Sequence, residues 1–103
     1  MEGSWYQGSD IKTQVTLTAA GFDMDLDEWS IHVYLNGKKV HTYPKHNCRR
    51  DDDGKWYCCI SRDYLKKSGS LMLVGEAGIQ DTDFEDGLRH ETDVAKIGTY
   101  KKV

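Results

Sequence analysis

The sequence has no hydrophobic run long enough to cross a membrane. Its longest apolar stretch, Leu71–Val74, is far shorter than the roughly 20 residues that a spanning helix needs. The first residues, MEGSW, also lack the basic and apolar segments of a secretory signal. We therefore expect a soluble protein that is synthesised in the cytoplasm and has no membrane partner.

Cysteines are few, and none are spaced as in a typical zinc site. The chain has 3, an odd number that suits a reducing compartment better than a disulfide framework. Cys48, Cys58, Cys59 and the nearby His46 offer zinc-binding atoms, but no C-x-x-C motif is present. Cys58 and Cys59 are neighbours in a predicted strand, so their side chains point to opposite faces. We predict no metal here, a buried Cys58 and a partly exposed Cys59.

Positive charge is not in excess either. The chain has 14 Lys and Arg residues against 17 Asp and Glu residues, which gives a net charge of -3. Nucleic-acid binding needs a concentrated basic surface, because Lys and Arg contact the phosphates. The basic residues of this chain occur only in short groups, such as Lys38–Lys39 and Lys66–Lys67. We therefore expect no nucleic-acid partner.

The sequence does contain a succession of alternating polar and apolar residues, which is typical of β-strands. This alternation predicts strands over residues 11–19, 29–35, 38–44, 55–61, 69–80 and 88–103. Ser61 is a suitable N-cap for one helical turn over residues 62–67. Residues 1–9 are predicted to be an N-terminal arm, and residues 10–103 a single domain. The fold class is all-β, as an antiparallel immunoglobulin-like β-sandwich of about six to seven strands or, alternatively, a small barrel.

Asn36–Gly37 lies between two of these strands and is a strong signal for a two-residue hairpin turn, because both turn positions need a positive φ. Such a turn places Leu35 opposite Lys38. Counting outward along the two strands then puts His32 opposite His41 on the outer face. Two facing imidazoles would titrate near neutral pH and would make an interface at this place sensitive to pH.

The strand over residues 69–80 is apolar on both faces. Leu71, Leu73 and the residues that follow them at alternate positions predict one buried face. Met72 and Val74, on the other face, are apolar too, which predicts that another polypeptide covers them. We expect a homo-oligomer or a complex, and the interface candidates are Trp5, Tyr6, Tyr34, Tyr57, Met72 and Val74.

The last strand changes the parity of its apolar residues. Leu88 and Val94 share one parity, whereas Ala95 and Ile97 share the other. An extra residue in one strand of a pair produces such a change. We therefore predict a β-bulge near Val94–Ala95, or burial of both faces.

Two loops are rich in carboxylates, which are among the ligands that Ca²⁺ prefers. The candidate calcium ligands are Asp23, Asp25 and Asp27 in the first loop and Asp81, Asp83 and Asp86 in the second. Neither loop has the glycine that an EF-hand carries at its sixth position. Aspartate is also a common turn residue, because its side chain accepts hydrogen bonds from the nearby backbone. Solvated or salt-bridged loops are therefore the alternative.

No catalytic or cofactor motif is present. A small enzyme would have to use His32 with Asp or Cys neighbours, but no pocket-forming motif supports one. Trp29 and Trp56 share the inward parity of their strands, so only the N-terminal aromatics and surface tyrosines remain for a carbohydrate platform. We expect a protein that is not an enzyme and has no cofactor. The alternative is a carbohydrate- or calcium-dependent binding module.

Three motifs of the chain resemble a known family. They are GFDM at residues 21–24, DGKWY at residues 53–57 and DTDFEDGLRHE at residues 81–91. With the strand order, they are similar to a group of small β-sandwich structural proteins of tailed phages, and through these to the N-terminal domain of phage upper-baseplate proteins. The resemblance covers roughly residues 11–94. It implies a virion structural or adaptor protein of the tail, baseplate or fibre, made in the host cytoplasm and in contact with other virion proteins or itself.

Overall fold

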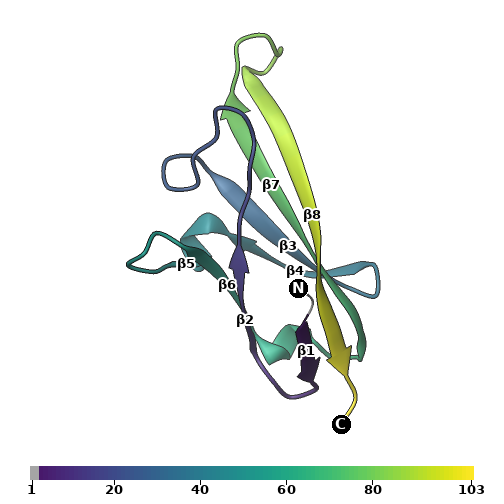
Figure 1. Ribbon diagram of the computed structural model, residues 1–103. Helices are drawn as coiled ribbons and strands as arrows, with labels where there is room; N and C mark the ends of the chain where they lie inside the picture. The colour runs from purple at the N-terminus through teal and green to yellow at the C-terminus, as the bar shows by residue number, and fades with distance from the viewer. Residues whose placement is uncertain (1–2) are drawn as a thin grey trace.

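The computed structural model describes residues 3–103 and is all-β, as predicted, with two short 3₁₀ turns (Figure 1). The strands are β1 (Gly3–Tyr6), β2 (Ile11–Val15), β3 (Trp29–Leu35), β4 (Lys38–Pro44), β5 (Arg49–Arg50), β6 (Trp56–Ile60), β7 (Gly69–Gln80) and β8 (Leu88–Lys101), and the turns are η1 (Lys45–Asn47) and η2 (Arg62–Tyr64). The sequence pattern does not predict β1 or β5. Strand β1 lies within the predicted arm, whose first residues, Met1 and Glu2, fall outside the described part of the chain.

The strands form two sheets. The larger sheet has the order β1-β8-β7-β3-β4, in which β1 is parallel to β8 and every other pair is antiparallel. The smaller sheet has the order β2-β6-β5 and is antiparallel. Figure 1 shows that the β7–β8 hairpin extends well beyond the strands on either side of it. The tip of this hairpin therefore projects from one end of the molecule.

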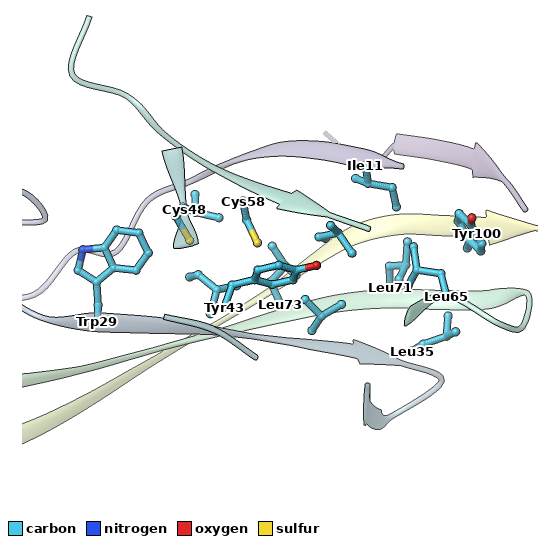
Figure 2. Close-up of a cluster of buried hydrophobic side chains, with 14 of the residues drawn as sticks. Ile11, Trp29, Leu35, Tyr43, Cys48, Cys58, Leu65, Leu71, Leu73 and Tyr100 are labelled. Atoms are coloured by element: carbon cyan, nitrogen blue, oxygen red, sulfur yellow. The ribbon is translucent and has the colours of Figure 1, made fainter. Parts of the chain in front are cut away.

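One hydrophobic core lies between the two sheets (Figure 2). Its buried side chains are Ile11, Val15, Cys58 and Ile60 from the small sheet, Trp29, Ile31, Val33, Leu35, Tyr43, Leu71, Leu73, Ala77 and Tyr100 from the large sheet, and Cys48 and Leu65 from the connections. Strand β3 buries every second residue, as its alternation predicts. The predicted face of β7 is also buried. Periodicity alone therefore identifies the core faces of the two central strands.

Two buried tyrosines connect the large sheet to the ends of the small one. The Tyr43 hydroxyl accepts a hydrogen bond from the Ser61 backbone N–H at 3.0 Å. The Tyr100 hydroxyl donates to the Ser9 carbonyl at 2.9 Å and accepts from the Gly8 N–H at 3.0 Å. A buried phenol is costly without such partners, so these bonds fix how the connections leave the small sheet. Burial raises the pKa of Tyr43, which stays a neutral donor and acceptor.

The β3–β4 hairpin has the predicted two-residue turn. Asn36 and Gly37 have φ values of 54° and 79°, and Leu35 lies opposite Lys38. The Asn36 side chain also donates to the Ser68 carbonyl at 2.9 Å, which connects the turn to the start of β7. The positive φ at both turn positions gives the twist that adjacent strands require.

Beyond the turn, the predicted pairing of His32 with His41 is wrong. The register shifts by one residue at Val40, so His32 lies opposite Thr42 and bonds to its hydroxyl oxygen at 2.8 Å. The His41 ring instead stacks on Tyr64, with 3.7 Å between the ring centroids. A bulge adds one residue to one strand only, so every pair beyond it moves by one position.

Two predicted elements are shorter in the structure. Strand β2 ends at Val15, opposite Trp56 at the start of β6, because no strand is available to pair with residues 16–19. The helical turn covers only residues 62–64, with the predicted Ser61 cap accepting from the Asp63 N–H at 3.2 Å. It ends at Leu65, which leaves the helical conformation and is buried in the core.

The bulge in the last strand lies further along the chain than predicted. Leu71 pairs with Gly98 and Met72 with Lys96, so Ile97 is the extra residue. Ile97 packs against the core, and the buried Tyr100 follows after the shift in parity. The bulge thus turns the end of β8 so that its alternate residues face inward.

We expect Gly98→Ala to lower the free energy of unfolding by about 2–4 kcal/mol, because it should separate β1 from β8. Gly98 has a φ of 147°, and an added Cβ would overlap the backbone of Gly3. Urea unfolding measures the loss. Gly78→Ala is the control, since the nearest atom to its Cβ is a Leu88 methyl at 3.8 Å, and it should cost less than about 1 kcal/mol. Equal losses of stability in the two variants would contradict the close approach of Gly98 to the backbone of Gly3.

Candidate functional site

The outer face of the large sheet carries an apolar group of side chains, Tyr34, Met72, Val74 and Val94. Tyr34 lies opposite Met72 in the β3–β7 pair, and Val74 lies opposite Val94 in the β7–β8 pair. Directly opposed side chains on one face lie within contact distance of each other. Val94 is 63% exposed and the other three are half-buried, while the small sheet covers the opposite face. We call these four residues the outer apolar group.

Polar side chains border this group. The His32 ring bonds to the Glu76 carboxylate at 2.9 Å, and this pair lies on the outer face next to Val74. Lys96 lies opposite Met72 in the β7–β8 pair. An apolar centre with a polar rim is the usual composition of a protein–protein interface.

The other predicted interface residues lie elsewhere. Trp5 packs against the core, and Tyr6 is 56% exposed on β1, opposite Lys101. Tyr57 lies on the outside of the small sheet, where the Lys12 ammonium is 5.1 Å from its ring centroid. The structure therefore brings together Tyr34, Met72 and Val74 of the predicted set and adds Val94. The alternation of β8 could have predicted that Val94 lies on the outer face. Its position opposite Val74 depends on the register between β7 and β8, which the sequence does not show.

Strand β8 also presents a free edge over much of its length. Its residues 88–96 pair with β7 on one side and Ile97 is the bulged residue, whereas β1 reaches only residues 98–101 on the other side. Within residues 3–103, no other strand pairs with this edge. An edge of unpaired N–H and C=O groups can pair with a strand of another chain. Val94 lies in the middle of this edge, so the outer apolar group and the free edge adjoin.

The first acidic loop uses its carboxylates within the chain. Asp25 accepts hydrogen bonds from Arg50 Nε at 2.8 Å and from Trp56 Nε1 at 2.9 Å. These two bonds hold the pKa of Asp25 below its ordinary value. Asp23 accepts from the Asp25 N–H at 2.8 Å, and Asp27 accepts from the Asp23 N–H at 2.8 Å. The loop is thus closed by local turns and one ion pair.

The second acidic loop uses two of its carboxylates in a similar way. Asp81 pairs with Arg89 at 3.3 Å, and Asp86 pairs with His90 at 3.1 Å. Hydrogen bonds from His90 and from the backbone of Leu88 lower the pKa of Asp86. Across residues 3–103, no three His, Cys, Asp or Glu side chains are grouped as metal ligands would be. The six candidate calcium ligands do not form a coordination sphere in either loop.

The cysteines have the predicted orientations. Cys58 is fully buried and Cys59 is exposed, as neighbours in a strand should be. Cys48 is buried too, and its hydrogen bond with Cys58, together with burial, raises the pKa of the Cys58 thiol. Cys48 and Cys58 therefore act as small apolar side chains in the core.

Comparison with protein-family models, curated proteins and solved structures gives no match for this chain. In the described part of the chain, no helix has the length and apolar character needed to cross a membrane.

We expect Asp25→Asn to destabilise the protein near neutral pH but not in acid. A lowered pKa in the folded state stabilises the fold above the unfolded pKa, and this contribution is lost as the pH falls through the folded pKa. The difference in melting temperature between wild type and variant should therefore shrink as the pH falls below 3.8, the ordinary value for the group. Thermal unfolding at a series of pH values measures it.

Asp52→Asn is the matched control, since it makes the same change of charge nearby. Within residues 3–103, the Asp52 carboxylate takes part in no ion pair. The melting temperature of the Asp52→Asn variant should equal that of wild type at every pH. The same pH-dependent loss in both variants would contradict the role of the Asp25 contacts.

Proposed function

We propose that this chain is a non-enzymatic structural or adaptor protein of a phage-type virion, acting through protein–protein contacts. The observation that carries the proposal is the outer apolar group of Tyr34, Met72, Val74 and Val94 beside the free edge of β8. The virion location is proposed because DTDFEDGLRHE at residues 81–91 resembles a segment of phage tail and baseplate proteins. Synthesis in the host cytoplasm and a location in the virion tail, baseplate or fibre belong to the same proposal.

The physical case rests on how these residues are placed. Val94 is a β-branched side chain on the outer face of the sheet, and 63% of its surface is exposed to water. Removing apolar surface from water is favourable by roughly 25 cal/mol per Å², so a partner that covers this group gains free energy. The adjoining edge of residues 88–97 offers main-chain hydrogen bonds to the same partner. Side-chain and main-chain contacts can thus act together.

We further infer that the fold is an immunoglobulin-like sandwich. What supports this is the order of the strands: β8, β7, β3 and β4 take the places of strands G, F, C and C′, and β2, β6 and β5 those of B, E and D. Strand β1 then adds a short parallel strand beside β8. Such a fold hosts many functions, so it supports a binding role without specifying a partner.

We expect Val94→Asp to remove the chain from assembled particles while leaving its fold intact. A carboxylate within an apolar surface that a partner covers should weaken association at least about tenfold. Exposed positions tolerate such changes within about 1 kcal/mol, so circular dichroism and melting should show a folded protein. A tagged chain, produced with the particles and followed through a density gradient, gives the measurement.

Gln14→Asp provides the control, because Gln14 is exposed on β2 of the small sheet, away from the outer apolar group and from the edge of β8, and the change adds the same charge. Wild type and this control should sediment with the particles, and Val94→Asp should stay with the free protein. A wild-type chain that is always recovered as a free monomer would argue against the proposed function. Recovery of Val94→Asp in particles would exclude the outer apolar group as the contact.

A further inference from the structure

A groove with a basic rim lies between the β3–β4 hairpin and the η2 region. Its floor is mainly apolar, and its rim carries amino groups. The lining residues are Leu35, Val40 and Tyr64 on the floor, Lys38, Lys66 and Lys67 on the rim, and Asn36 of the hairpin turn. The cavity has a volume of about 340 Å³. All three lysines are exposed, and none lies within 4.0 Å of a carboxylate in the described part of the chain. We call this cavity the lysine groove.

The tip of the β7–β8 hairpin has the opposite character. Phe84 is 48% exposed there, between the exposed carboxylates of Asp83 and Glu85. Within residues 3–103, Asp81 and Asp86 are held by ion pairs, whereas Asp83 and Glu85 form none. Backbone bonds from Phe84 N–H to Asp81 O at 3.3 Å and from Gly87 N–H to Phe84 O at 2.9 Å give the tip a defined shape. An aromatic side chain is thus presented between two free negative charges.

The lysine groove and the tip lie at opposite ends of strand β7. Strand β7 starts beside the groove, two residues after Lys67, and ends at the tip (Figure 1). Its 12 residues span about 40 Å at the usual rise of a strand. The molecule is 50 Å along its longest axis. The tip of one chain therefore cannot reach the groove of the same chain, but it can reach the groove of another.

We propose that the tip of one copy binds in the lysine groove of a second copy. Phe84 would lie on the apolar floor, and Asp83 and Glu85 would pair with the lysines of the rim. This inference rests on the proposed structural role and names one partner for it. Opposite charges steer the two surfaces together and fix their orientation, while burial of the ring supplies free energy.

A second copy fits the groove better than an isolated anion for two reasons. An anion would satisfy the lysines but would leave the floor of Leu35, Val40 and Tyr64 uncovered. The tip supplies both the charge and the apolar ring, and its backbone bonds hold it in shape before binding.

The contact joins two different surfaces, so it repeats head to tail and produces rings or open filaments.

The test reverses the charge of each surface separately. Lys38→Glu, Lys66→Glu and Lys67→Glu are combined in a groove variant, and Asp83→Lys and Glu85→Lys in a tip variant. All five positions are exposed, so both variants should fold. Sedimentation of the full chain at low ionic strength should show wild-type mass rising with concentration above 11.8 kDa, and falling back when salt is added.

Each variant alone should remain monomeric, because its tip and groove then carry the same sign. An equimolar mixture should associate again, since the acidic tip of the groove variant fits the basic groove of the tip variant, and the basic tip fits the acidic groove. Phe84→Ala keeps every charge and should weaken wild-type association at least about tenfold.

A mixture that stays monomeric, or a wild-type chain that is monomeric at all concentrations, would overturn the proposal. Association that persists in both variants would do so as well, and would assign self-contact to another surface. None of these results bears on whether wild-type chain sediments with particles. A chain absent from particles would overturn the proposed function independently.

Discussion

The long β7–β8 hairpin is the element on which the other features of the molecule depend. Its strands have 12 and 14 residues, whereas the strands of the small sheet have at most 5. The small sheet can therefore cover only part of the hairpin. Beyond it, residues 16–20 lie against the inner face, with Leu17 packed close to Gly75 and the Ala20 carbonyl bonded to Arg89. Only a glycine leaves room for the Leu17 side chain there, so the longer layer is covered by a loop rather than a strand.

This difference in length produces the free edge of β8 and the projecting tip. The hairpin continues past β3 on one side and past β1 on the other, which leaves the edge of β8 without a neighbouring strand. The same extension carries the tip of the hairpin to one end of the molecule (Figure 1), and Phe84 of the tip is exposed. The free edge and the projecting tip are thus both consequences of the length of these two strands.

Much of the fold follows from periodicity, and the exceptions have definite causes. The alternation of β3 and of β7 predicts which side chains enter the core, because both strands bury one face along their whole length. The sequence pattern does not predict the bulge at Val40. It does predict a bulge in the last strand, near Val94–Ala95, but the observed position at Ile97 depends on the pairing with β7. Strands β1 and β5 are too short to show a period. They form because neighbouring strands offer them hydrogen bonds.

The candidate sites show where sequence reasoning ends. Met72 and Val74 could be assigned to an outer face from parity alone, and the structure places them there with Val94 beside them. Tyr57 has the same outward parity but lies on the other sheet, because parity does not say to which sheet a strand belongs. The lysine groove is formed by residues from two hairpin strands and the η2 connection, so no local sequence motif predicts it. Its complement, the acidic tip with Phe84, is visible in the sequence, but its distance from the groove follows only from the length of β7. Because β7 is so long, the tip cannot reach the groove of its own chain, and the two surfaces can meet only between two copies.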